Sequence, residues 1–379
     1  MENNFLSPAI NVYLGEVLKD IPVVFILEKH LRPESQVKQN LWNLFQVGEQ
    51  AQKFDFIKIV KDPQEADFFM LPHNYFILRN KLGEKRRDTY LEEFVTKAKT
   101  YNKKILVLAM ADSDEDINIE NSIIFRQSQY GYKKKANEII MPFFTSPVCS
   151  EVFMAEREKI WQNIVLRDKS EKPVVSFCGW AGFPSFYRHI TYLFSVFVCD
   201  FKKYFLLNRH AWLHKRGIYF RRKAMSALGG SKLVETNFII RKSYSAQKGF
   251  DGLLSIAPEE AEKQYVENIL NSDFVLSPKG NGNGSIRFYE ALSLGRFPVL
   301  INTDCVLPLA DVINYNDFVV EVEHDDLSSL ECKITEFYNA LDNEEFHRRQ
   351  RLAREAFEML RPDVFFKSSL SENLQIKSN

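Results

Sequence analysis

The sequence lacks the cysteine patterns that indicate a disulfide framework or a zinc site. Its five cysteines are odd in number and widely separated, and no CxxC pair occurs. Neither kind of site is therefore favoured, and a reducing compartment fits best. An excess of one charge is missing as well, because 50 Lys and Arg residues balance 50 Asp and Glu residues. A neutral chain has no global attraction for nucleic acid or an anionic membrane, so we expect any anion binding to depend on local basic clusters.

Long uncharged apolar segments are also missing. Residues 1–22 contain no basic region followed by an apolar core, so they do not predict a secretory signal. The longest apolar run, residues 192–207, is interrupted by Asp200, Lys202 and Lys203 and falls short of a membrane span. We therefore expect a cytoplasmic protein without a transmembrane segment and without a nucleic-acid partner. Nothing in the sequence determines its oligomeric state.

The order of apolar segments predicts two α/β domains, which suits a chain of 379 residues. In the first half, strands are expected at 22–27, 56–60, 67–71, 104–110, 123–125 and 138–141, and helices at 30–45 and 86–101. Strands that alternate with helices indicate a parallel sheet covered on both faces. A charged segment, 151–172, ends at Pro173 and separates this half from a second unit that starts with a strand at 174–178.

The most informative stretch is 274–301, which predicts a strand, a Gly-rich turn, a short helix and another strand. Gly280, Gly282 and Gly284 allow the backbone to approach a ligand closely. The helix is expected to open near Ser285, and a helix N-terminus with unpaired N–H groups suits a diphosphate. Arg287 and Glu290 lie three residues apart on this helix, where one can bind phosphate oxygens and the other can accept from a diol.

This stretch is neither a Walker loop nor a dinucleotide fingerprint. GxxxxGK[ST] is absent, and the Gly-x-Gly-x-Gly pattern lacks the expected βαβ context. On the residues alone, a Gly-rich loop capped by a solvated Arg/Glu pair is an equally good interpretation.

A family resemblance favours the functional interpretation. Ser277–Gly280, Ser285–Ala291, Gly295 and Pro298–Val299 resemble the signature of the exostosin family of glycosyltransferases, and a weaker similarity extends over most of residues 60–345. The sequence departs from the family pattern at two positions. Lys279 stands where arginine is common, and Arg296 stands where a small or apolar residue is usual.

The resemblance implies an α/β fold of the GT-B type, with two Rossmann-like parallel-sheet domains facing a central cleft. We expect an acceptor-side domain at 1–165, a nucleotide-sugar-binding domain at 172–345, and a C-terminal helix and tail at 346–379 that is free to return to the first domain. Eukaryotic members are typically anchored in the Golgi membrane. The expected absence of an anchor suggests a cytosolic enzyme of microbial or viral origin.

The implied function is that of an inverting hexosyl- or pentosyltransferase. It would move a sugar from a nucleotide diphosphate sugar, with UDP favoured, to a hydroxyl of a glycan acceptor. The alternative is a non-catalytic subunit that binds a nucleotide sugar or glycan and supports a partner transferase. An epimerase is disfavoured because the dinucleotide fingerprint is missing.

Two sets of site residues follow. His73, after the Leu71–Pro72 turn, and Asp112, after a strand, are candidates for the catalytic base, although His73 also suits a hydrogen-bonded loop. The residues expected to bind the donor are Lys279, Gly280, Gly284, Ser285, Arg287, Glu290, Gly179 and Arg188.

No metal or other cofactor is expected. The acidic run Asp112–Asp116 contains a DxD pattern that could hold a divalent cation, but a solvated loop is the favoured interpretation. Arg216, Arg221, Arg222 and Lys223 could meet an anionic glycan, and a solvated helix face is favoured there too.

Overall fold

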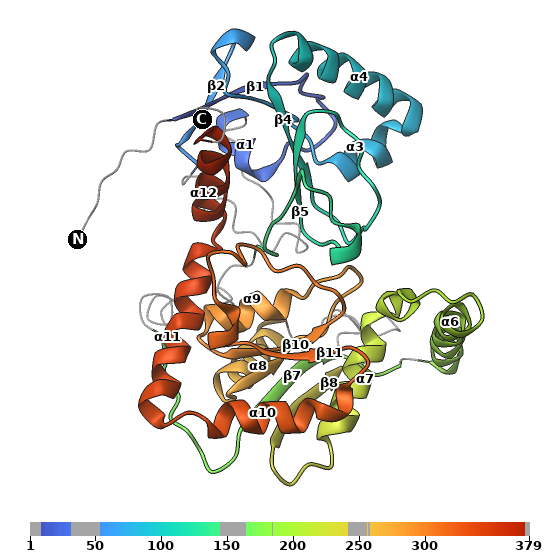
Figure 1. The fold of residues 1–379 in the computed structure, drawn as a ribbon, viewed down its shortest axis with the longest axis vertical. Helices are drawn as coiled ribbons and strands as arrows, with labels where there is room; N and C mark the ends of the chain where they lie inside the picture. Colours follow the sequence, from blue (N-terminus) through green and yellow to red (C-terminus); the bar gives the residue numbers. More distant parts are fainter. Residues whose placement is uncertain are drawn as a thin grey trace. The chain divides into compact units, whose positions relative to one another are not determined.

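The computed structural model describes residues 9–31, 54–144, 164–183, 185–241, 256 and 258–375. The chain divides into two compact units (Figure 1). Unit 1 comprises Met1–Phe144, Val306–Pro308 and Met359–Asn379, and unit 2 comprises Thr145–Cys305 and Leu309–Glu358. The predicted helix at 30–45 lies outside the described residues beyond Leu31, and the charged segment at 151–172 does so up to residue 163.

Unit 1 is built on a six-stranded sheet in the order β2-β1-β3-β4-β5-β6. Every neighbouring pair is parallel. The strands are β1 (Ile10–Leu14), β2 (Ile57–Val60), β3 (Phe68–Met70), β4 (Lys104–Ala109), β5 (Ser122–Arg126) and β6 (Glu138–Ile140). The helices are α1 (Phe25–Leu31), α3 (Tyr75–Leu82), α4 (Glu84–Thr100) and α12 (Pro362–Gln375), with short 3-10 turns η2 (Pro63–Glu65) and η3 (Gly131–Lys133).

The strand predicted at 22–27 is wrong. Helix α1 begins at Phe25, and Val23 forms only an isolated antiparallel bridge with His73. The first strand is Ile10–Leu14, which the sequence reading missed. The periodicity of a short apolar run does not distinguish a buried helix from a buried strand. Here the segment forms a helix. The other predicted strands of this unit are confirmed to within two residues at either end.

Unit 2 is built on a five-stranded sheet in the order β11-β10-β9-β7-β8, again parallel throughout. The strands are β7 (Val174–Trp180), β8 (Glu235–Arg241), β9 (Phe274–Leu276), β10 (Phe297–Asn302) and β11 (Val320–Glu323). The helices are α6 (Phe186–Tyr204), α7 (Gly217–Leu228), α8 (Pro258–Leu270), α9 (Ile286–Ser293), α10 (Leu330–Asn339) and α11 (Asn343–Met359). The 3-10 turns are η5 (Ala211–His214), η6 (Tyr315–Asp317) and η7 (Leu327–Ser329). Two parallel-sheet α/β units confirm the predicted fold class.

The last helix, α12, packs in unit 1 although it is far from that unit in sequence. Phe365 and Phe366 are fully buried. The Phe366 ring lies 5.0 Å from the Phe125 ring on β5 and 5.7 Å from the Phe144 ring. Helix α11 before it belongs to unit 2, so the chain passes from one unit to the other at its C-terminal end.

The strand order of unit 2 places a topological switch between β7 and β9. The chain leaves β7 toward β8 on one side, returns to β9 on the other side, and then continues outward through β10 and β11. Ligands of open parallel sheets bind outside the carboxyl ends of the strands at such a switch. The corresponding point in unit 1 lies between β1 and β3. None of the described helices combines the length and hydropathy that a membrane crossing requires.

Candidate functional site

The candidate site lies at the carboxyl ends of β7 and β9 in unit 2, at the switch of its sheet. Strand β9 ends at Leu276 and leads into the Gly-rich turn, and helix α9 begins at Ile286 with Ser285 as its N-cap. Strand β7 ends with Cys178, Gly179 and Trp180. The predicted strand, turn, helix and strand of this stretch are therefore all present.

The Gly-rich turn is closed on itself and tied to the next strand. The Gly280 N–H donates to the Gly284 carbonyl over 2.7 Å. The Asn283 side chain accepts from the Thr303 hydroxyl at 2.5 Å and donates to the Asp304 carbonyl at 3.0 Å. Thr303 and Asp304 follow β10, so the loops after two neighbouring strands hold one another. The turn has a defined shape in front of α9.

Helix α7 supports the turn from the other side. A Cβ on Gly217, the first residue of α7, would lie 2.2 Å from the Lys279 carbonyl oxygen and 2.5 Å from that of Gly280. Buried Arg221 donates to the Trp180 carbonyl at 3.0 Å and to the Lys279 carbonyl at 3.5 Å. The guanidinium thus links the ends of β7 and β9. A solvated position is wrong for Arg221, whereas Arg216, Arg222 and Lys223 are exposed.

Arg287 lies in the first turn of α9 and crosses to β7. Its Nη2 and Nε donate to the Cys178 carbonyl at 3.2 and 3.4 Å. Its guanidinium carbon lies 4.8 Å from the centre of the Phe177 ring. Gly179 has φ 153°, and a Cβ at that position would lie 2.2 Å from Arg287 Nη2. The predicted pair Gly179 and Arg287 is brought together, and the guanidinium has room only because residue 179 has no side chain.

Glu290 is buried one turn further along α9. Its carboxylate accepts a hydrogen bond from the Tyr265 hydroxyl of α8. Burial raises the pKa of Glu290, while the Tyr265 hydrogen bond and the Arg287 charge act in the opposite direction. Burial and the neighbouring Glu290 also raise the pKa of Tyr265. Arg287, Glu290 and Tyr265 therefore form one electrostatically coupled group beside β7 and β9.

The remaining residues predicted to bind the sugar donor do not all lie at the site. Ser285 is a buried N-cap residue of α9. Lys279 is also buried, and its ammonium donates to the Leu213 carbonyl at 2.6 Å. Arg188 lies on the first turn of α6 with an exposed side chain. The structure brings Gly179, Gly280, Gly284, Ser285 and Arg287 to the site, turns the Lys279 ammonium toward η5, and places Arg188 on a separate surface helix.

Arg296, the second departure from the family pattern, stabilises the fold and lies away from the Gly-rich turn. It is fully buried, and it donates to the Val165, Leu294 and Leu270 carbonyls at 3.0 Å each. Burial lowers its pKa to about 10. It lies at the C-terminal end of α9, opposite the Gly-rich turn, so its side chain joins the ends of α8 and α9.

In unit 1, His73 lies after β3, next to the switch of that sheet. The Leu18 N–H donates to its Nε2 at 2.8 Å, and its Nδ1 lies 2.9 Å from the Pro22 carbonyl, to which it donates. Since His73 is fully buried, this geometry matches the hydrogen-bonded loop histidine that was the alternative. Its role as a base stays a prediction.

Asp112 follows β4 and is exposed. The acids after it are paired one by one with cations. Lys133 contacts Asp114 at 3.0 Å, Lys135 contacts Asp116 at 3.8 Å, and Arg79 pairs with Glu115. Within the described ranges, no group of three or more His, Cys, Asp or Glu side chains is arranged to hold a metal ion. The role of Asp112 as a base also stays a prediction.

Residues 218–336, from α7 to α10, match the family described as "Exostosin GT47 domain". This segment of the chain is therefore similar to the exostosin GT47 domain. The matched range holds the Gly-rich turn, Arg221, Tyr265, Arg287 and Glu290, which are most of the residues of the site.

Two relatives illustrate the match. A probable glycosyltransferase of Arabidopsis thaliana is 35% identical over 105 residues, covering 27% of this chain and 20% of that protein. Exostosin-1c of Danio rerio is 46% identical over 57 residues, covering 15% of this chain and 8% of that protein. The matches thus span no more than a fifth of these relatives. Among solved structures, the calicheamicin glycosyltransferase CalG4 aligns with 98% of this chain and 100% of its own at 8% identity, with a TM-score of 0.34.

Sequence reasoning missed three residues of the site. Asn283 could have been predicted from the sequence, because an Asn side chain inside a Gly-rich turn commonly forms the hydrogen bonds that anchor the turn. Arg221 was seen only as part of a basic cluster. Tyr265 gave no signal, because its contact with Glu290 spans 25 residues and depends on how α8 packs beside α9.

Proposed function

We propose that this protein is an inverting glycosyltransferase that moves a sugar from a UDP-sugar to a hydroxyl of a glycan acceptor. Two findings support the proposal: the match of residues 218–336 to the exostosin GT47 domain and the site at the β7–β9 switch. The single observation that carries it is the position of Arg287. Its guanidinium lies on the first turn of α9, behind a closed Gly-rich turn.

In this proposal the donor diphosphate binds at the N-terminus of α9. The backbone N–H groups of Gly284 and Ser285 and the guanidinium of Arg287 would contact its oxygens, because both the helix dipole and the cation favour a dianion there. Glu290 would accept from the ribose hydroxyls. Lys279 would contribute only its backbone to the donor site, because its ammonium donates to the Leu213 carbonyl.

The reaction is a single displacement. The acceptor oxygen forms a bond to the anomeric carbon while the bond from that carbon to the diphosphate oxygen breaks. The proton of the acceptor hydroxyl passes to a base, and the bonding pair leaves with UDP, whose charge Arg287 and the backbone dipoles stabilise. Asp112 is the first base to test, because His73 would have to release its bond from the Leu18 N–H before it could accept a proton.

One observation favours the second candidate, a non-catalytic subunit that binds a nucleotide sugar. The position where family members commonly carry arginine holds Lys279, and its ammonium contacts a protein carbonyl. Arg296, the other departure from the family pattern, does not favour this candidate, because its guanidinium donates to backbone carbonyls within the fold.

A two-step experiment tests the proposal. A thermal-shift screen against nucleotide sugars identifies the donor, because a ligand that binds the folded state raises its stability by mass action. The release of UDP from that donor is then measured with and without glycan acceptors. We expect stabilisation by UDP-sugars and release of UDP. Stabilisation without any turnover would favour the binding subunit, and stabilisation by no nucleotide sugar would contradict both candidates.

A further inference from the structure

Helix α6 presents its apolar side to solvent. Phe186, Ile190, Leu193, Phe194, Phe197 and Phe201 are all exposed, and the last turn and the residues after it add Tyr204, Phe205, Leu206 and Leu207. In a helix with 3.6 residues per turn, the spacing of the first six places them on one stripe that covers about a third of the circumference. Exposed fractions of 66% for Phe194 and 62% for Phe197 show how little covers this stripe.

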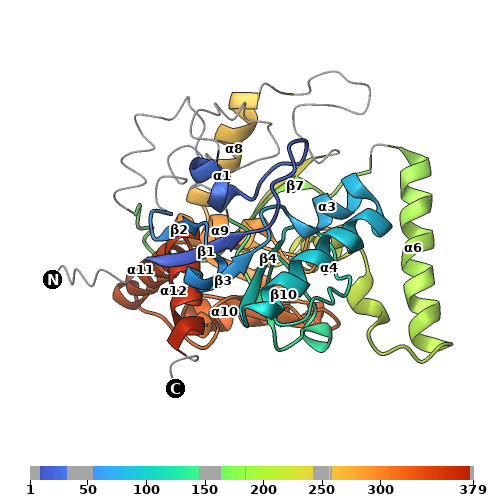
Figure 2. The ribbon, with the colours of Figure 1, turned by 90° about the horizontal axis from the view of Figure 1, so that it is seen from above.

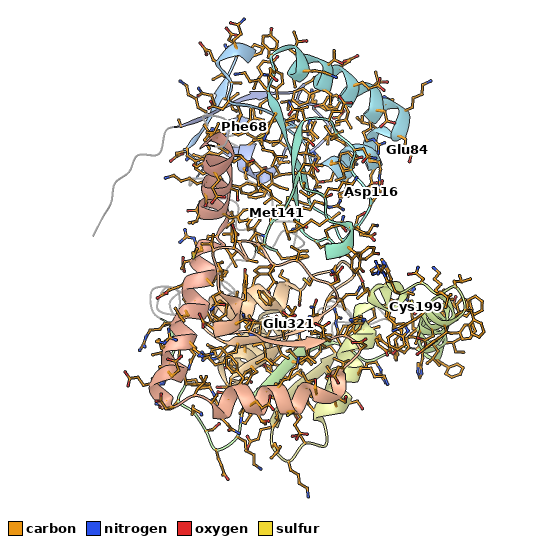
Figure 3. The ribbon with its side chains drawn as sticks, in the orientation of Figure 1. Phe68, Glu84, Asp116, Met141, Cys199 and Glu321 are labelled. Carbon is orange, nitrogen blue, oxygen red and sulfur yellow. The ribbon has the colours of Figure 1, made fainter. Side chains whose placement is uncertain are left out.

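The polar side of α6 faces the protein. Asp200 pairs with Lys215 at 2.7 Å, and the Lys203 ammonium lies 3.4 Å from the centre of the Trp212 ring in η5. The His189 ring stacks on Phe183 with centroids 4.8 Å apart. The helix is thus anchored through its polar side, the reverse of an ordinary surface helix. Figures 1 and 2 show α6 standing apart from the helices that cover the sheet of unit 2, and Figure 3 draws its side chains, with Cys199 labelled.

The charges around the stripe favour one kind of partner. Lys202 on α6 and Arg209 just after the helix are exposed. The single carboxylate of the helix, Asp200, is half-buried in its pair with Lys215. An apolar stripe rich in Phe and bordered by Lys and Arg is the composition of a helix that lies in a lipid interface, where anionic headgroups attract the cations.

We propose that α6 is an in-plane docking helix for an anionic lipid bilayer. The helix has 19 residues, and none of the described helices meets the requirements of a membrane crossing. It therefore lies along the surface, with its phenylalanines in the acyl region and Lys202 and Arg209 at the level of the headgroups. This inference is independent of the proposed catalytic function.

The test is flotation of the full-length protein with vesicles of phosphatidylcholine alone or mixed with phosphatidylglycerol. We expect flotation with the mixed vesicles only, and weaker flotation as salt is raised, because salt screens the attraction. Phe194→Ser and Phe197→Ser should each reduce the fraction bound at least tenfold, as expected for the loss of one buried aromatic side chain. Lys202→Glu should reduce it about thirtyfold, because the substitution removes one positive charge and adds one negative charge.

The matched control is Leu233→Ser, which makes a similar change at a side chain that is 56% exposed elsewhere in unit 2. It should float like the wild type. All variants alter exposed positions, and unchanged thermal unfolding in the absence of lipid verifies that they fold. Failure of the wild type to float overturns the proposal. Flotation of Phe194→Ser and Phe197→Ser to the same extent as the wild type also overturns it. A wild-type dimer that Phe197→Ser dissociates, without vesicle binding, also overturns it and assigns the stripe to a second copy of the chain.

Discussion

Arg287 is the residue on which the candidate site depends most. Its guanidinium contacts the Cys178 carbonyl and the Phe177 ring, so it is positioned by β7 before any ligand binds. A cation held in this way loses little conformational entropy when it binds a phosphate. The alternative from the sequence, a solvated Arg/Glu pair, is wrong for Glu290, whose carboxylate is buried and accepts from Tyr265.

We expect Arg287→Ala to weaken UDP binding about ten- to a hundredfold, because charge-assisted hydrogen bonds contribute roughly 1.5–3 kcal/mol each. Arg287→Lys should recover only part of the affinity, since a point charge does not reproduce the bidentate geometry of a guanidinium. Isothermal titration of UDP into the folded variants measures both effects. Unchanged affinity in Arg287→Ala would remove the main support for the proposed function.

Glu290 predicts a dependence of stability on pH. Burial raises its pKa above the ordinary value of 4.5, so the folded state binds the proton more tightly than the unfolded state does. Ionised Glu290 therefore destabilises the fold above the raised pKa, and this penalty disappears as pH falls toward 4.5. Glu290→Gln should raise the free energy of unfolding relative to wild type at neutral pH, with no gain at pH 4.

Urea titrations of both proteins at several pH values test this expectation. Tyr265→Phe is the companion variant, because it removes the hydroxyl that donates to the carboxylate. It should destabilise the protein more at neutral pH than at acidic pH. A difference between Glu290→Gln and wild type that does not change with pH would contradict the raised pKa.

At the scale of elements, the site depends on the close approach of β7 and α9. Gly179 permits that approach, because a side chain there would overlap the Arg287 guanidinium and would also be strained at φ 153°. Gly217 has the equivalent role between α7 and the Gly-rich turn, where a Cβ would meet two backbone oxygens. Glycine thus allows close packing at the end of β7, through Gly179, and at the start of α7, through Gly217.

Gly179→Ala should displace the guanidinium and weaken UDP binding about as much as Arg287→Ala does, although residue 179 need not touch the nucleotide. Gly230→Ala is the matched control, because no heavy atom lies within 4 Å of the position that its Cβ would occupy. Titration of UDP into both variants compares them. Wild-type affinity in Gly179→Ala would show that the position of Arg287 tolerates a methyl group at residue 179.

At the scale of the whole molecule, helix α12 belongs to the same unit as strand β1, although more than 340 positions separate them. Phe366→Ala should lower the stability of unit 1 by about 3–5 kcal/mol, because its buried ring contacts Phe25, Phe125 and Phe144. Val364→Ala on the same helix, where the side chain is 42% exposed, should change stability by less than about 0.5 kcal/mol. Denaturant unfolding measures both effects, and equal stabilities would contradict the assignment of α12 to the core of unit 1.

We also expect transfer to persist in excess EDTA. Asp114, Glu115 and Asp116 are each paired with a Lys or Arg side chain, which competes with a metal ion for the carboxylate. The proposed diphosphate site relies instead on Arg287 and on backbone N–H groups. The assay follows UDP release with the identified donor and acceptor. Complete loss that manganese restores would make Asp112 and Asp114 the candidate ligands.

Local patterns in the sequence determined much of this protein. Apolar runs separated by helical periodicity predicted the parallel sheets, and the order strand, glycines, Ser285 and Arg287 located the candidate site. Such features depend on neighbours within a few residues, where spacing along a strand or helix decides which groups lie together. The run at 22–27 marks the limit, because its length and composition suit a buried helix as well as a strand.

Only the tertiary structure decided which faces and ends meet. The pairing of β7 with β9, the link from Arg221 to both strand ends and the pairing of Tyr265 with Glu290 join residues that are 25 to 99 positions apart. The sequence shows α6 as amphipathic but does not state which side is covered, and its polar side proved to be the anchored one. Contacts across the whole unit determine which side chains are buried. They therefore also determine the roles of Lys279, Arg287 and Arg296, which the spacing of residues along the sequence does not encode.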